Sequence, residues 1–190
     1  NAGAAIPWDV NADFSLADVA YLICRGGWPI SVLAQREIAV DVTKNYFNSL
    51  FVFEDCENGR FRNKQPEVMK MIVRSYARHI STEAAVSTII ADLRQNNERT
   101  MDVKTYNGYV EALGDLFILE DMPAWNPNIR SKTSIRSTPT RHFVDASIAC
   151  MALGAGPNDL LKDLESFGLF FEDMAVRDLR IYAEVNGGEV

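Results

Sequence analysis

The sequence is poor in the residues that build metal sites and disulfide frameworks. It contains three cysteines and two histidines in 190 residues. Cys24, Cys56 and Cys150 form no Cys-x-x-Cys pair and have no neighbouring histidine, so the sequence offers no zinc site. An odd number of scattered thiols fits a reducing compartment, and we expect Cys24 and Cys150, which lie in apolar runs, to be core residues. We expect His79 and His142 to be structural.

Motifs of catalysis and of membrane insertion are also missing. The sequence has no Gly-x-Ser-x-Gly elbow and no Gly-x4-Gly-Lys-Ser/Thr loop, so it has no Walker-type loop to bind a nucleotide. No stretch approaches about 18 consecutive apolar residues, and no signal peptide opens the chain. We therefore expect a cytoplasmic chain that is not an enzyme, has no membrane partner and takes no cofactor itself.

What the sequence does contain is typical of a soluble globular protein. Its residues are 47% hydrophobic and 24% charged, and a chain of this length buries about 70% of its unfolded surface. The formal net charge of −7 argues against a surface that binds nucleic acid as a whole. Small residues at 1–5 and an Asn-Gly turn signal at 186–187 predict that the chain is a piece of a longer one.

Apolar periodicity predicts a mainly α chain. A Ser15 cap begins a helix that ends at Gly26, and Trp28-Pro29 opens a second helix that we expect to run to about residue 53. The apolar face expected for that second helix is Ile30, Leu33, Ala34, Ile38, Val42 and Tyr46. A third helix begins at Pro66, with a buried stripe of Val68, Met69, Ile72, Val73, Tyr76 and Ile80. Further helices are expected at 145–153, 159–166 and 169–184.

A helix-turn-helix followed by a hairpin is predicted in the middle of the chain. Ser81 or Thr82 is expected to cap the first of its helices, and residues 95–100 are expected to form the turn. Asp102 is expected to cap the second helix, over 102–116, with an inner face of Val103, Tyr106, Val110, Leu113 and Phe117. Residues 117–120 and 141–144 then predict two short strands. Two helices and a hairpin with a long polar tip make a winged helix.

A local excess of positive charge marks the predicted hairpin. No acidic residue lies between Asp121 and Asp145, and the window holds Arg130, Lys132, Arg136 and Arg141. With Lys104, Thr105 and Asn107 on the exposed face of the preceding helix, these are the candidate nucleic-acid contacts. Glu111 and Asp115 on the same helix would repel phosphate. The alternative interpretation, a solvated loop without a ligand, stays open.

Five short motifs follow one another over nearly the whole chain, from about residue 15 to residue 190. They are Arg25-Gly26-Gly27-Trp28-Pro29, Thr105-x3-Tyr109-x3-Leu113-x2-Leu116-Phe117, Pro123-Ala124-Trp125-x-Pro127-Asn128, His142-Phe143-Val144-Asp145 and Gly168-Leu169-x-Phe171-Glu172-x2-Ala175-Val176-Arg177-Asp178-Leu179. In this order they resemble the C-terminal region, a domain of unknown function, of a large family of predicted prokaryotic AAA+ type ATPases.

The resemblance implies what a full-length family member contains. An N-terminal P-loop ATPase domain, which this chain lacks, would bind ATP and Mg²⁺. The final part resembles the start of a restriction-endonuclease-like α/β fold, in which a helix glutamate and a later Asp…Glu-x-Lys cluster hold a metal. Glu172 matches that glutamate, but the later cluster is absent from the sequence. One carboxylate does not hold Mg²⁺ as a nuclease does, so Glu172 is expected to be an exposed or salt-bridged helix residue.

These observations predict four segments and leave two functions open. The segments are a tail or linker at 1–14, helices at 15–65, a winged-helix-like domain at 66–145, and C-terminal helices at 146–190 that begin a truncated nuclease-like domain. The first function is a non-catalytic accessory region of an ATPase that binds DNA through the basic window. The second is a docking region for the protein's own ATPase domain or a sister subunit, without nucleic-acid binding.

Overall fold

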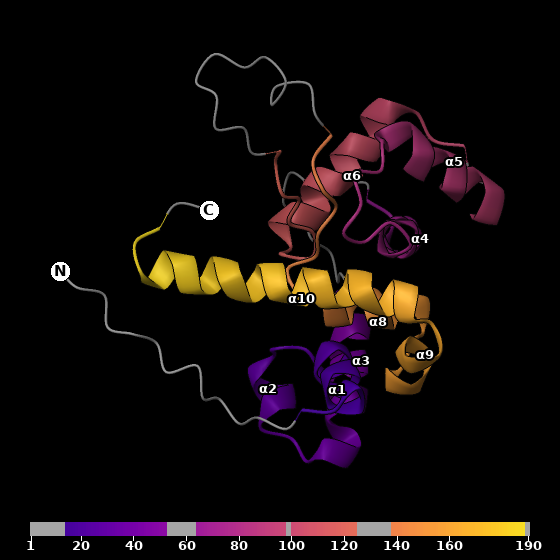
Figure 1. Ribbon diagram of the computed structural model, residues 1–190. Helices are drawn as coiled ribbons and strands as arrows, with labels where there is room; N and C mark the ends of the chain where they lie inside the picture. Colours follow the sequence, from indigo (N-terminus) through magenta and orange to yellow (C-terminus); the bar gives the residue numbers. More distant parts are fainter. Residues whose placement is uncertain (1–13, 53–63, 98–99, 125–137, 189–190) are drawn as a thin grey trace.

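Helices account for most of the structure. The computed structural model describes residues 14–52, 64–97, 100–124 and 138–188, and these residues confirm the predicted mainly α class. In chain order the helices are α1 (Leu16–Arg25), α2 (Pro29–Val32), α3 (Arg36–Ser49), α4 (Pro66–Ala77), α5 (Val86–Asn97), α6 (Val103–Asp115), α8 (Ala146–Leu153), α9 (Pro157–Lys162) and α10 (Leu164–Val185) (Figure 1).

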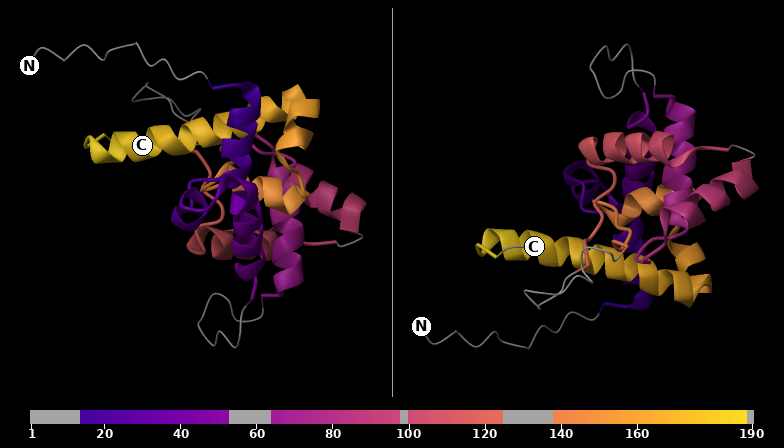
Figure 2. Two further views of the ribbon diagram at one scale, coloured as in Figure 1. Left: turned by 90° about the horizontal axis from the view of Figure 1, so that it is seen from below. Right: turned by 90° about the horizontal axis from the view of Figure 1, so that it is seen from above.

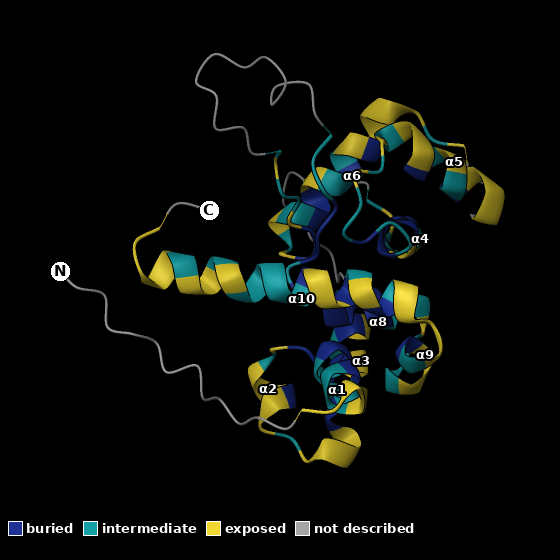
Figure 3. Cartoon of the chain, viewed as in Figure 1, coloured by how far each residue is buried: buried dark blue, intermediate teal, exposed yellow. Residues whose placement is uncertain are grey.

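Helix α8 is the centre of the fold. Its residues are apolar or small on every side, and the five from Ala146 to Cys150 are all buried. A helix that is apolar all round is stable only when other elements cover it. Helices α1, α3, α4 and α10 pack against α8, and Figure 3 shows it as a dark-blue segment beneath α10.

The core joins segments that are far apart in the sequence. Ile23, Ile72, Leu113, Ile148 and Phe170, from five different helices, belong to one cluster of buried apolar side chains. Helix α10 crosses the molecule, with α1 to α3 on one side of it and α4 to α6 on the other (Figure 1). The C-terminal half of α10 extends past the other helices in all the views (Figures 1 and 2).

Local sequence signals place several helices correctly. The Ser15 hydroxyl accepts a hydrogen bond from the Asp18 backbone N–H at 3.2 Å and caps α1, as predicted. Asp102 caps α6 in the same way, accepting from the Thr105 N–H at 2.9 Å. All six residues of the stripe predicted for α4 are buried.

The single helix predicted over 28–53 is wrong. The chain forms the short α2, turns at residues 33–35 and starts again as α3. The Thr43 hydroxyl donates to the Arg25 carbonyl at 2.6 Å and contacts the Ser31 hydroxyl at 2.8 Å. This buried polar contact turns a different face of α3 inward. The buried residues of α3 are Ala39, Thr43 and Phe47, whereas Ile30, Leu33 and Ile38 of the predicted face are exposed.

Two predictions about the helix-turn-helix also need correction. Helix α5 starts at Val86, so neither Ser81 nor Thr82 caps it; the Ser81 N–H instead donates to the Arg141 carbonyl at 2.8 Å. On α6, Tyr106 and Leu113 are buried as predicted, but Val103 and Phe117 are exposed. Val103 is the first residue of the helix, and Phe117 lies past its end at φ 54°, so neither continues the inner face.

The predicted strands reduce to two isolated antiparallel bridges, Leu119 with Phe143 and Met122 with Thr140. The Met122 and Thr140 backbones exchange hydrogen bonds of 2.9 Å in both directions. Residues 125–137, the predicted tip of the hairpin, lie outside the described residues. At the C-terminal end, the two predicted helices are displaced along the sequence and become α9 and α10, because Asp163 caps α10 through the Ser166 N–H.

The position of Leu113 in the core gives a direct test of this fold. Leu113→Ala removes a fully buried side chain and should lower the free energy of unfolding by about 2–5 kcal/mol in urea denaturation. Val103→Ala, on the exposed face of the same helix, is the matched control and should change it by less than about 0.5 kcal/mol. Equal losses for the two variants would show that the assignment of the α6 faces is wrong.

Candidate functional site

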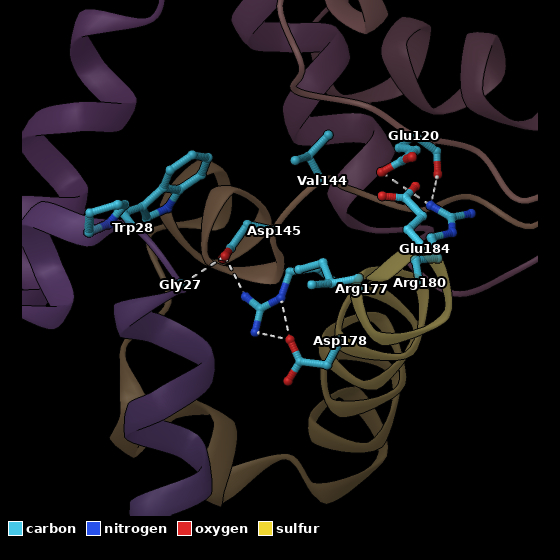
Figure 4. A pocket seen from close by; sticks show the side chains of 11 residues that line it. Gly27, Trp28, Glu120, Val144, Asp145, Arg177, Asp178, Arg180 and Glu184 are labelled. Carbon is cyan, nitrogen blue, oxygen red and sulfur yellow. Dashed lines mark hydrogen bonds and ion pairs between the residues drawn. The ribbon is translucent and has the colours of Figure 1, made fainter. Parts of the chain in front are cut away.

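A pocket lies where the turn between α1 and α2, the segment around the β-bridges and helix α10 meet. Its volume is about 560 Å³, and Figure 4 shows the side chains that line it. Trp28 and Gly27 come from the turn, Glu120 and Asp145 from the middle of the chain, and the charged residues Arg177, Asp178, Arg180 and Glu184 from α10. Three of the five motifs in the sequence therefore meet at one place.

Asp145 holds these three segments together. Its carboxylate accepts hydrogen bonds from the Gly27 N–H at 2.8 Å and from the Arg177 guanidinium, and its other oxygen accepts from the Ser147 N–H at 2.9 Å. The Trp28 indole N–H donates to the Ser147 hydroxyl at 2.9 Å and extends the network. Because the Asp145 side chain is only 5% exposed, these partners replace its hydration.

The glycines of the Arg25-Gly26-Gly27 motif make this approach possible. Gly26 has φ 72° and ψ −178°, a conformation that is essentially restricted to glycine. A Cβ atom on Gly26 would lie 2.4 Å from the Ser147 hydroxyl and 2.7 Å from an Asp145 carboxylate oxygen. The backbone therefore needs glycine at this position for two reasons, its dihedral angles and its distance to Asp145.

The two arginines of the pocket are already paired. Arg177 contacts Asp145 and donates to Asp178 at 2.8 Å, while Arg180 donates to the Glu120 carbonyl at 3.2 Å and lies 3.3 Å from its carboxylate. Burial lowers the pKa of Arg177, but the carboxylates of Asp145 and Asp178 outweigh it and raise the pKa above its ordinary value. The pocket has four carboxylates and two guanidinium groups, so it carries a net negative charge.

A second buried polar pair joins α10 to the same segment from inside the core. The His142 Nδ1 atom lies 2.8 Å from Asp173 Oδ1, which also accepts from the Phe143 N–H at 3.0 Å. Burial raises the pKa of Asp173, and its hydrogen bond to His142 opposes that shift. Both side chains are at most 1% exposed, so no substrate reaches them, and the pair is structural, as expected for His142.

The candidate nucleic-acid contacts are only partly described. Lys104, Thr105 and Asn107 are exposed on α6, as predicted, and the Thr105 hydroxyl donates to Asp102 at 2.7 Å as part of the helix cap. Arg130, Lys132 and Arg136 lie outside the described residues.

The assignment of Arg141 to a nucleic-acid surface is wrong. Arg141 is buried, forms an ion pair with Asp121, and donates to the Ala84 carbonyl at 3.0 Å. The Tyr76 hydroxyl also donates to Asp121. The carboxylate of Asp121, just before the acid-free window, therefore neutralises the guanidinium of Arg141 near the end of that window through their ion pair. The β-bridges bring these two residues together, and a count of charges along the sequence misses the pair.

The other predictions about sites concern thiols, metals and the membrane. Cys24 and Cys150 are buried core residues, as predicted, and burial raises the pKa of the Cys150 thiol. Glu172 is exposed on α10, and no group of three His, Cys, Asp or Glu that could hold a metal occurs among the described residues. In the described part of the chain, no helix is both long and apolar enough to cross a membrane.

Comparison with known proteins supplies a family. Residues 16–159 match a domain of unknown function, DUF8612. The chain belongs to this family. The match includes Gly26, Gly27 and Asp145 but ends before Arg177, so it contains two of the three segments that meet at the pocket. No curated protein and no solved structure matches the chain significantly.

The charged side chains around this pocket of the DUF8612 chain can form ion pairs and hydrogen bonds. The residues that line the pocket include no serine, cysteine or histidine to act as a nucleophile with its base. Sequence reasoning used the segments around Asp145 and Arg177 only as a family signature and missed their contact. The sequence contains the diglycine at 26–27 and the charged residues Asp145 and Arg177, but it does not show that they meet. Gly27 and Asp145 are 118 residues apart, and Asp145 and Arg177 are 32 residues apart, so these spacings predict no contact by themselves.

Two glycines with positive φ provide a graded test of the Asp145 network. Gly154→Ala places a Cβ where nothing lies within 4 Å, so it should lower the free energy of unfolding only through backbone strain, by about 1–2 kcal/mol. At Gly26, φ 72° with ψ −178° is a conformation that alanine avoids more strongly than the left-handed φ 69°, ψ 25° of Gly154, and the added Cβ also collides with Ser147 and Asp145. Gly26→Ala should therefore lower the free energy of unfolding by about 3 kcal/mol or more in urea denaturation. A Gly26→Ala variant as stable as Gly154→Ala would contradict the close approach.

Proposed function

We propose that the chain is a non-catalytic docking region of a P-loop ATPase, and that it binds the ATPase domain of its own protein or of a sister subunit. The resemblance to the C-terminal region of AAA+ type ATPases supports the choice of partner. One observation carries the docking role: the C-terminal half of α10 presents large apolar side chains to solvent.

These side chains lie close together on α10. Leu179, Tyr182 and Val185 follow one another at intervals of three residues, which places them on neighbouring positions of the helix surface. Their exposed fractions are 66%, 64% and 81%, and the nearby Ile181 is 49% exposed. Single exposed apolar residues are ordinary, but a contiguous group marks a surface that another protein covers.

The absence of catalytic motifs from the sequence supports the non-catalytic part of the proposal. The sequence has no phosphate-binding loop, so ATP hydrolysis would belong to the partner domain. The metal-binding glutamate that the resemblance suggests, Glu172, has only one acidic neighbour in sequence, Asp173, and that carboxylate is buried against His142. A rigid helical scaffold with an exposed apolar helix end is suited to positioning another domain.

Calorimetric titration of the chain with a separately expressed P-loop ATPase domain of the same family tests the proposal. Leu179→Ser with Tyr182→Ser should weaken binding at least about tenfold, because each side chain contributes about 1.5–3 kcal/mol when it is fully buried. Val103→Ser removes an exposed apolar side chain from α6 and should leave binding unchanged. If the chain does not bind the ATPase domain, or if both variants bind as the wild type does, the proposal fails.

DNA binding is the second candidate, favoured by the exposed Lys104 and Asn107 at the start of α6 and by the acid-free stretch of sequence that follows. Its test is a mobility-shift assay at two salt concentrations. Changing Arg130, Lys132 and Arg136 together to Ala should weaken binding to all sequences alike and reduce the salt dependence. If affinity and salt slope do not change, those residues are not the DNA contacts.

A further inference from the structure

We propose that the pocket beside α10 receives an arginine or lysine side chain from an amphipathic segment of the docking partner. This inference rests on the proposed docking function and adds the chemistry of the segment that docks. It follows from the charges that line the pocket, from the apolar surface next to it, and from the pairing of the arginines already present.

The charge of the pocket favours a cation. Both guanidinium groups are already paired with carboxylates: Arg177 donates to Asp145 and Asp178, and Arg180 forms an ion pair with Glu120. Glu184 lines the same pocket, and Figure 4 shows its carboxyl group beside Glu120 and Arg180. An incoming anion would have to break an existing ion pair, whereas a cation finds negative charge in excess.

The carboxylates at the mouth are accessible, unlike Asp145. The side chains of Glu120 and Asp178 are 53% and 42% exposed, and Glu184 is exposed. Asp145 is buried and fully used by the network, so it sets the shape of the pocket and the outer carboxylates meet the ligand. A cation held there keeps contact with water, which avoids the desolvation cost of a buried ion pair.

Apolar surface adjoins the pocket from two elements. Ile181 of α10 lines it, and Tyr182, the next residue, and Val185, one turn further on, are exposed. On the opposite wall, Trp28 and Pro29 line the pocket where α2 begins. A segment that places apolar side chains on α10 and a basic side chain in the pocket would complement both features, and the net charge of −7 attracts such a segment over a distance.

Fluorescence anisotropy with two synthetic peptides tests this inference. The first peptide is an amphipathic helix of leucine and arginine, and the second has glutamate in place of each arginine. Glu120→Gln with Glu184→Gln should weaken binding of the arginine peptide about tenfold, the effect of losing two exposed charge pairs. Glu165→Gln with Glu172→Gln makes the same change of net charge on exposed residues of α10 outside the pocket, and should leave the affinity nearly unchanged.

Nuclear magnetic resonance of the backbone amide and tryptophan indole N–H groups of the wild-type chain gives a second measurement, which needs no substitution. The arginine peptide should shift the signal of the Trp28 indole N–H, which lies at the pocket and donates to Ser147. Three results would overturn the inference: an equal loss of affinity for the arginine peptide in the two double variants, binding of the glutamate peptide as tight as that of the arginine peptide, or an unshifted Trp28 indole signal. Because neither measurement uses the ATPase domain, a failure of the proposed docking partner and a failure of the charge preference are separate results.

Discussion

The buried carboxylate of Asp145 is the interaction on which the rest of the structure depends. It begins α8, the central helix, and it accepts hydrogen bonds from the turn after α1 and from the side of α10. A buried charge is stable only when every part of it is paired, so the position of Gly27 and that of Arg177 are fixed by the same group. Helices α1 and α10 are thereby held against α8.

This network gives a physical meaning to the motifs of the sequence. Gly26 and Gly27 allow the backbone to approach Asp145, and Arg177 neutralises it from α10. The residues of these motifs therefore serve the architecture of the fold. What remains free for a partner is the outer surface, where Glu120, Asp178 and Glu184 are exposed beside the apolar end of α10. The proposed functions place binding on that surface.

Local signals predicted the helical class, several helix caps and the buried stripe of α4, and long-range contacts decided what they missed. The cap at Asp102 and the core position of Leu113 depend on residues within one helix, so the sequence pattern sufficed. The buried face of α3 depends on Thr43 reaching the carbonyl of Arg25, and the burial of Arg141 depends on Asp121. Those partners lie 18 and 20 residues away, beyond the reach of helical periodicity or a charge count.

A double-mutant cycle on Asp145 and Arg177 tests most directly whether this pair holds the fold together. Asp145→Asn, Arg177→Gln and the double variant would be compared with the wild type by urea denaturation at one pH. Because the two groups share one buried network, we expect the double variant to lose less than the sum of the single variants, with an interaction energy of about 1–3 kcal/mol. Losses that add to within about 0.5 kcal/mol would show that the two residues stabilise the protein independently, and would contradict the central role of Asp145.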